Sequence, residues 1–167
     1  MKQIFLGFFL LLVSIGVLYI IKFKPEAMHG DFSHILPEKI SFKKQTTPAI
    51  TIKEHTFQLL LAKTEAERNK GLSGKDSLPE NTGMLFVFDT PYIEEFWMKE
   101  MRFPLDIIYI KNKHIITIFN RVPNPTTQNP LIHTVEPSQP ADKVLEINAG
   151  LSEKYHFTVG DSVQISL

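Results

Sequence analysis

The amino-acid sequence predicts an α+β protein: a compact, mainly β domain with a barrel-like sheet and one or two short helices, preceded by one transmembrane helix. Three observations predict this class. Residues 4–21 form an apolar run without a single charge. From residue 49 onward, short apolar runs alternate with turn signals, which is typical of short strands. Only residues 64–71 and 151–155 favour helices, so the sheet dominates the domain.

The composition excludes several functional classes. The 18 Lys and Arg residues balance the 18 Asp and Glu residues, whereas a nucleic-acid-binding domain normally carries a strong basic excess. The absence of cysteine excludes disulfides, cysteine nucleophiles, zinc–thiolate sites and iron–sulfur clusters. The six histidines lack the local spacing of metal ligands. We therefore predict no nucleic-acid partner, no metal and no cofactor.

The apolar run at residues 4–21 is long enough to cross a membrane. At about 1.5 Å per helical residue it spans roughly 27 Å, which is close to the ~30 Å hydrocarbon core of a bilayer. Within that core the backbone must be helical, because no water can satisfy its polar groups. Lys2 before the run, and Lys22 and Lys24 after it, end the apolar segment sharply. We predict a single-pass transmembrane helix.

A cleaved signal peptide is the competing interpretation of this run. The run exceeds the ~7–15 apolar residues of a typical signal peptide, and no small-residue cleavage site follows it closely. An uncleaved signal anchor is therefore favoured. Lysines flank both ends, so the charge distribution does not decide the orientation. The short tail before the anchor and the long domain after it predict a cell-membrane protein whose globular domain is extracytoplasmic.

The chain divides into four predicted segments. They are an N-terminal tail at residues 1–3, the transmembrane helix at 4–21, a linker or stalk at 22–48 and a globular domain at 49–167. The stalk contains Pro25, Pro37 and Pro48 and shows no sustained periodicity. A flexible stalk of this length has a root-mean-square reach of about 30 Å, which would keep the domain near the bilayer.

The domain begins with a predicted hairpin and a helix. The segments AITI and TFQLLLA are typical of two strands joined at residues 53–55. Thr64, followed by Glu67 three residues later, fits a capping box and predicts the start of a helix. Gly71 and Gly74 predict its end.

The remainder of the domain is predicted to consist of strands interrupted by one loop and one helix. The strand segments are MLFVF at 84–88, EEFWM at 94–98, DIIYI at 106–110, HIITIF at 114–119, IHTVEP at 132–137, KVLEI at 143–147 and SVQIS at 162–166. A proline-rich loop at 122–130 follows the fourth of these. A short helix around residues 151–155 precedes the last.

Four ordered motifs give the domain a family resemblance. They are R-x-x-G-L (Arg68, Gly71 and Leu72), G-M-L-F (83–86), F-W-M-K (96–99) followed by P-L-D (104–106), and A-G (149–150) before a terminal G-D (160–161). In order and spacing these motifs resemble the uncharacterised family called domain of unknown function 192, over residues 52–166. The resemblance implies a compact, mainly β domain that is often found behind a signal or anchor, and it implies no established reaction.

The segment FWMKEMRFPLD carries the densest set of functional groups in the sequence. In a strand, Trp97 and Lys99 share one face. An aromatic ring and a lysine side by side could hold a ligand through apolar contact and charge, and Asp106 could pair with Lys99 or with Arg68. In the alternative interpretation, Trp97 belongs to the core, Lys99 lies along it and Asp106 caps a turn.

Arg68 and Glu146 are the other candidate site residues. Arg68 falls in the last turn of the predicted helix, where a cation complements the helix dipole, or it points into a cleft and binds a carboxylate or phosphate. Glu146 shares its strand face with Val144, and one face of that strand is expected to be outward. A pair of Glu146 with Asp106 would suit acid–base hydrolysis of a glycosidic bond if the carboxyls lay about 5–10 Å apart.

The leading hypothesis is a non-catalytic binding module tethered to the membrane. Its ligand-binding candidates are Arg68, Trp97, Lys99, Asp106 and Glu146, and its ligand is an anionic small molecule, a glycan or a protein segment. Besides the membrane, the expected partner is thus a small ligand or an envelope protein. Two alternatives stay open: a cell-envelope hydrolase that uses acidic residues, and a structural assembly partner, which would show a large exposed apolar patch. No catalytic residue is assigned.

Overall fold

The structure, a computed structural model of the chain, describes residues 47–167. The transmembrane helix predicted at 4–21, and nearly all of the predicted stalk, lie outside the described residues. Among the residues that the structure does describe, no helix is long and apolar enough to span a bilayer. The predicted anchor therefore stays a prediction.

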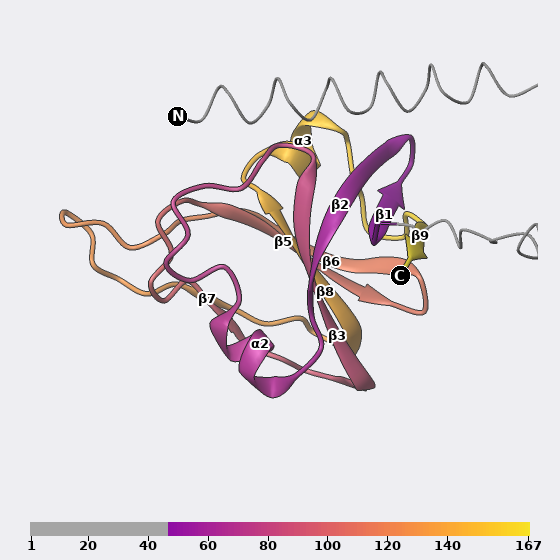
Figure 1. Cartoon of the computed structure of the whole chain (residues 1–167), viewed down its shortest axis with the longest axis horizontal. Coiled ribbons are helices and arrows are strands. Elements are labelled where there is room, and N and C mark those ends of the chain that lie inside the picture. Colours follow the sequence, from indigo (N-terminus) through magenta and orange to yellow (C-terminus); the bar gives the residue numbers. More distant parts are fainter. Residues whose placement is uncertain (1–46) are drawn as a thin grey trace, which may run out of the picture. The chain divides into compact units, whose positions relative to one another are not determined.

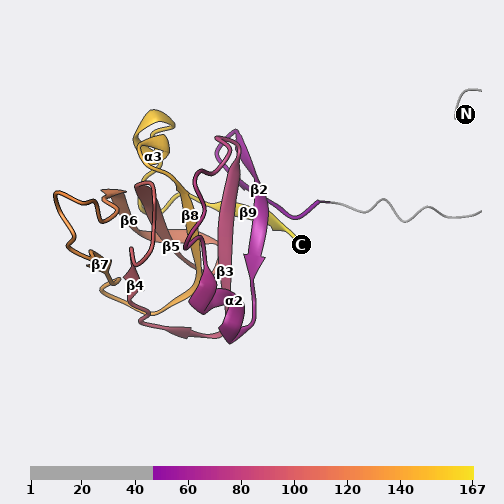
Figure 2. The ribbon, with the colours of Figure 1, turned by 60° about the vertical axis from the view of Figure 1, so that its left-hand side comes forward.

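The described part of the chain contains nine strands and two short helices (Figure 1). In chain order they are β1 (Ala49–Ile52), β2 (His55–Ala62), α2 (Glu65–Lys70), β3 (Thr82–Tyr92), β4 (Phe96–Trp97), β5 (Leu105–Lys111), β6 (His114–Val122), β7 (Thr134–Val135), β8 (Ala141–Asn148), α3 (Leu151–Lys154) and β9 (Val163–Ser166). The two helices lie toward opposite ends of the strands in both views of the ribbon (Figures 1 and 2).

Seven of these strands form one sheet in the order β6-β5-β8-β3-β2-β1-β9. Every pairing in this sheet is antiparallel except that of β2 with β3, which is parallel. The connection between these two strands contains α2, as a parallel pair requires a crossover. The remaining strands, β4 and β7, pair with each other in a separate two-stranded sheet, which lies beside the large one (Figure 2).

The large sheet curls until its two edge strands meet at one end. The amide of Ile115 in β6 donates to the carbonyl of Asp161 at 3.0 Å, and the amide of Val163 in β9 donates to the carbonyl of Lys113 at 2.8 Å. An isolated bridge joins His114 and Ser162 between these bonds. The sheet is therefore a curled half-barrel, which confirms the predicted mainly β, barrel-like domain with few short helices.

Both faces of the sheet are covered, so the domain has two hydrophobic clusters. The inner core lies within the curl and receives side chains from all seven strands, together with α3 and Phe157. The outer core lies on the other face, under β4, β7 and the segment that links α2 to β3. Strand β5 is buried at its first six positions because it contributes to both clusters.

Local sequence explains where several elements begin and end. Helix α2 starts at a capping box, since the Thr64 hydroxyl accepts from the Glu67 amide and the Glu67 carboxylate accepts from the Thr64 amide. Between β5 and β6, Asn112 and Lys113 have φ angles of 49° and 65°, and two consecutive positive φ values match a tight hairpin turn. The start of α2 and the turn between β5 and β6 thus depend only on neighbouring residues.

Most of the predicted elements are confirmed in type and order. The EEFWM and IHTVEP segments differ, because only two residues of each form a strand and both lie outside the large sheet. The MLFVF strand extends over Thr82–Tyr92. The expected outward face of the strand at residues 143–147 is wrong, since β8 lies between β5 and β3 in the interior of the sheet, with a core on each side.

Candidate ligand-binding site

A cavity of about 180 Å³ opens beside the outer core, between α2, β3, β4 and β8. Its lining residues are Arg68, Asn69, Lys70, Gly71, Phe86, Phe88, Glu94, Glu95, Phe96, Trp97 and Glu146. Four of these side chains are aromatic and five are ionisable. A pocket with apolar walls and a few polar groups is the usual form of a small-ligand site.

The carboxyl of Glu146 lies in the wall that the sheet contributes to this pocket. Glu146 lies on the interior strand β8, where it pairs with Met84 of β3 and with Ile107 of β5. Its side chain is 5% exposed, and its Oε2 atom has no hydrogen-bond partner within the described residues. Burial raises the pKa of Glu146 to about 8, because the ionised form loses hydration. The carboxyl is therefore mainly protonated at neutral pH.

Aromatic side chains build the wall around this carboxyl. The ring of Phe86 meets the ring of Phe96 edge-on, with 4.8 Å between centroids, and Phe96 meets Tyr109 in the same way at 5.8 Å. The Tyr109 hydroxyl donates to the carbonyls of Glu94 and Val135 at 3.0 and 2.9 Å. Tyr109 thus connects β5 with the strand segments that cross over the outer face.

Helix α2 supplies the basic rim of the pocket. The Nη1 atom of Arg68 donates to the carbonyl of Val87 at 3.2 Å, and its guanidinium carbon lies 5.2 Å from the centroid of the Phe88 ring. The helix ends at Gly71, whose φ is +46°, and a Cβ there would lie 3.3 Å from the Phe86 ring. The glycine therefore permits both the turn and the close contact with the aromatic wall.

Carboxyl groups outnumber basic groups around the pocket. The lining acids are Glu94, Glu95 and Glu146, against Arg68 and Lys70. Within residues 47–167, none of these five side chains takes part in an ion pair. The ionisable groups at this site are thus not in ion-pair contact with one another.

The structure brings three of the five predicted site residues together. Arg68, Trp97 and Glu146 all line the pocket. Lys99 does not line it. It lies in the turn after β4, and its Nζ is 5.8 Å from the Trp97 ring centroid. Trp97 is 53% exposed, so the alternative that places it in the core is wrong.

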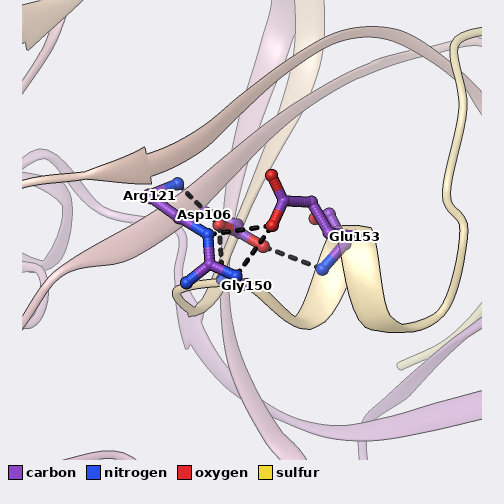
Figure 3. Close-up of polar contacts among 5 residues, drawn as sticks. Asp106, Arg121, Gly150 and Glu153 are labelled. Carbon is purple, nitrogen blue, oxygen red and sulfur yellow. Dashed lines mark hydrogen bonds and ion pairs between the residues drawn. The ribbon is translucent and has the colours of Figure 1, made fainter.

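Asp106 lies elsewhere, on the inner face of the sheet and completely buried. Its carboxylate accepts three backbone amides, those of Arg121 and Gly150 at Oδ1 and that of Ser152 at Oδ2, at 2.8–2.9 Å (Figure 3). The expectation that Asp106 shares a cleft with Lys99 or Arg68 is therefore wrong. Asp106 instead holds the start of α3 against β6. This role resembles the alternative interpretation, in which Asp106 caps a turn.

The carboxylate pair required by the hydrolase hypothesis does not form. Asp106 pairs with Ile147 across the β5–β8 ladder, whereas Glu146 pairs with Ile107. Successive side chains in a strand leave opposite faces, so the two carboxyls lie on opposite sides of the sheet. Among the described residues, no three His, Cys, Asp or Glu side chains lie close enough together to hold a metal ion.

Several pocket residues were not predicted from the sequence. Phe86, Phe88 and Phe96 are three of 13 phenylalanines, and no local pattern distinguishes them from the others. Glu94 and Glu95 directly precede Phe96 and Trp97, and this juxtaposition of two acids with two aromatics was the available signal. This signal does not show where the two acids lie, because β4 contains only Phe96 and Trp97 and leaves Glu94 and Glu95 outside the strand.

The fold and pocket define a small half-barrel domain with a buried acid in an aromatic-walled cavity. The family described as Uncharacterized ACR, DUF192, matches residues 48–165. The chain belongs to the DUF192 family, the domain of unknown function 192, as its motifs predict. A comparison with curated proteins found no match.

Two solved structures share the fold. A protein of unknown function from Novosphingobium aromaticivorans DSM 12444 is 30% identical with a TM-score of 0.63, over 70% of this chain and 82% of that one. A protein described as a candidate transcription regulator from Sinorhizobium meliloti 1021 is 24% identical with a TM-score of 0.62, over 71% of this chain and 91% of that one. The second likeness bears on the fold alone.

Proposed function

We propose that this chain is a membrane-tethered, non-catalytic binding module that holds a small molecule, a glycan unit or a side chain of a protein segment in the pocket at Glu146. One observation carries the proposal: the Oε2 atom of Glu146 is buried, borders a cavity and has no partner within the described residues. A buried carboxyl without a hydrogen bond costs free energy, and a ligand in the pocket would supply the missing bond.

The sequence-based expectation of an anionic ligand rested on Arg68 and Lys99, with Asp106 as their pair. Of these three residues, only Arg68 lines the pocket. The walls favour a ligand with an apolar body, and the charges favour a polar head group that reaches Glu146. The hydrolase alternative loses its support, because Asp106 lies on the other face of the sheet.

The single tryptophan of the chain makes this proposal testable. Because Trp97 lines the pocket, its fluorescence should report occupancy. Full-length protein in detergent is titrated with three ring compounds of similar size: benzylamine, benzyl alcohol and benzoate. We expect a saturable change in Trp97 emission with at least one of them, weakened in the pocket variant Phe88→Ala and retained in Asp76→Asn, which lies outside the pocket.

Saturation in the wild type with equal affinity in Phe88→Ala would place the binding elsewhere and contradict the proposal. No saturable change with any of the three compounds would contradict it as well.

The position in the cell is a separate part of the proposal and needs its own test. The chain contains no cysteine, so single cysteines introduced by Thr127→Cys and Lys2→Cys report the two sides of the predicted anchor. We expect a membrane-impermeant maleimide to label the Thr127→Cys protein in intact cells and to label the Lys2→Cys protein only after lysis. The reverse pattern would show that the globular domain faces the cytoplasm.

A further inference from the structure

We infer that the ligand of this pocket is an organic ammonium ion, a primary amine on a short apolar or aromatic body, whose N–H groups are received by the Glu146 carboxylate. This inference rests on the proposed function and names the chemical class of its ligand. It is argued from four features of the site: the vacant hydrogen-bonding position at Glu146, the charges around it, the aromatic walls and the size of the cavity.

The first feature is the kind of hydrogen bond that Glu146 lacks. An ammonium group has three N–H donors and no acceptor, whereas an ionised carboxylate only accepts. The two are complementary, and their hydrogen bond is charge-assisted. An anionic ligand brings acceptors only, so it could pair with Glu146 only while that carboxyl keeps its proton.

The second feature is the charge of the lining. Once Glu146 is ionised, as it is when paired with an ammonium ion, the carboxylates of Glu94, Glu95 and Glu146 outnumber the basic groups of Arg68 and Lys70. The Arg68 guanidinium already donates to the backbone carbonyls of Lys63 and Val87, so part of its hydrogen-bonding capacity is used within the protein. Within the described part of the chain, the acids that line the pocket form no ion pair. The site therefore favours a cation.

The third feature is the aromatic wall. The faces of aromatic rings carry negative potential and attract cations, which is how aromatic cages recognise amines. The pocket demonstrates this attraction with one of its own side chains, because the Arg68 guanidinium lies 5.2 Å from the centroid of Phe88. Phe86, Phe96 and Trp97 offer further ring surface in the same cavity.

The fourth feature is size. A cavity of about 150 Å³ in a protein interior accommodates a benzene molecule. The pocket here measures about 180 Å³, which is sufficient for a single ring or a short alkyl chain with its ammonium group. Two sources share this chemistry: a free amine and the lysine side chain of a protein segment.

Binding of an ammonium ion should release a proton. The raised pKa of Glu146 leaves its carboxyl protonated at neutral pH, and the ammonium ion pairs with the ionised form. The titratable and charged groups near this carboxyl are Arg68 and Lys70 of α2 and Glu94 and Glu95 before β4, which line the pocket with it, and Tyr109 of β5. Glu94 and Glu136, which follows β7, act on the Tyr109 hydroxyl as well. Affinity should therefore rise with pH until Glu146 is ionised.

The same three ring compounds test the inference, because they differ mainly in the head group. We expect benzylamine to bind full-length protein about tenfold more tightly than benzyl alcohol, and benzoate to bind most weakly, at about pH 8. Between about pH 6 and about pH 8, the benzylamine affinity should rise by up to tenfold per pH unit. Calorimetry at neutral pH in two buffers of different ionisation enthalpy should show close to one proton released per amine bound.

Two variants separate Glu146 from the other acids. Glu146→Gln should lower the benzylamine affinity by about tenfold or more and abolish both proton release and pH dependence, because a charge-assisted hydrogen bond is lost. Its affinity for benzyl alcohol should stay within about twofold, which also shows that the variant is folded. The matched control Glu95→Gln, at an exposed acid of the same pocket, should keep the proton release.

The results distinguish this inference from the proposed function. Tighter binding of benzoate or benzyl alcohol than of benzylamine, or benzylamine binding without proton release, would overturn the ammonium ligand while leaving a binding pocket. Failure of all three compounds to bind would overturn both. Nα-acetyl-lysine N-methylamide presents only a lysine side chain: binding as tight as that of benzylamine indicates a protein segment as the source, and weaker binding indicates a free amine.

Discussion

Asp106 and Glu146 lie on the neighbouring strands β5 and β8 one position out of register, so their side chains leave the sheet on opposite faces. Asp106 faces the inner core and binds backbone amides at the start of α3, whereas Glu146 borders the pocket on the outer face. The two buried acids of this sheet therefore have separate roles. The carboxylate of Asp106 is satisfied within the protein, whereas the Oε2 atom of Glu146 has no partner within the described residues.

Removal of the Asp106 carboxylate should destabilise the domain without affecting the pocket. Asp106→Asn replaces one acceptor oxygen by an amide that faces the backbone N–H groups of Arg121, Gly150 or Ser152. We expect the free energy of unfolding to fall by about 1–3 kcal/mol in urea titrations followed by Trp97 fluorescence. Asp76→Asn, at an exposed ion pair with Arg102, should change it by less than about 0.5 kcal/mol.

Equal stability of Asp106→Asn and wild-type protein would show that the amides at the start of α3 are satisfied in another way. A loss of ligand binding in a folded Asp106→Asn protein would contradict the separation of the two acids.

Glu146 should make the stability of the domain depend on pH. Its pKa is raised from 4.5 to about 8, so between these values the folded protein binds more protons than the unfolded chain. The stabilisation is fully present below about pH 4.5 and is lost as the pH rises toward about pH 8, at up to about 1.4 kcal/mol per pH unit. Urea titrations across this range measure the slope.

Glu146→Gln should remove the part of the pH dependence of the free energy of unfolding that Glu146 causes. Glu95→Gln should keep that pH dependence, because the Glu95 side chain is exposed. Identical slopes for the wild type and Glu146→Gln would mean that Glu146 is ionised at neutral pH in the folded protein.

Gly83→Ala should damage the sheet and the pocket together. A Cβ at Gly83 would lie 2.9 Å from Cδ1 of Leu145 and 3.1 Å from the carbonyl oxygen of Glu146, so the Leu145 side chain must move and the backbone of β8 at Glu146 must give way. We expect a loss of about 1–3 kcal/mol in the free energy of unfolding and weaker binding of the pocket probes. Gly160→Ala is the control, because a Cβ there meets nothing within 4 Å.

Gly160 has a φ of +96°, so its substitution should still cost about 1 kcal/mol through backbone strain. Only Gly83→Ala should change the binding of the probes, and an equal effect of both substitutions on binding would contradict this prediction.

The capping box of α2 should stabilise the rim of the pocket. Thr64→Ala removes the hydroxyl that accepts from the Glu67 amide at 3.3 Å, which costs about 1 kcal/mol of helix stability. Amide hydrogen exchange in Glu65–Lys70 should become faster, and the position of Arg68 should be less defined. Thr64→Ser keeps the hydroxyl and should exchange like the wild type; the same rates in Thr64→Ala would show that tertiary contacts alone hold the helix.

The helix start at Thr64 and the stop at Gly71 were predictable from the sequence because both depend on residues within one turn. The order of the strands along the chain was predictable for the same reason. The parallel pairing of β2 with β3 was not, since it joins residues about two dozen positions apart through hydrogen bonds that leave no local pattern. The two-residue length of β4 is also a result of tertiary structure, because β4 pairs only with β7.

By itself, the sequence determined the family and the mainly β composition of the domain. It also predicts the apolar anchor at residues 4–21, which lies outside the described residues. The role of each acid was decided only by tertiary structure. Register between β5 and β8 assigns Asp106 and Glu146 to opposite faces, and a slip of one residue would reverse this. Such a register depends on packing between distant segments, and one sequence does not reveal it.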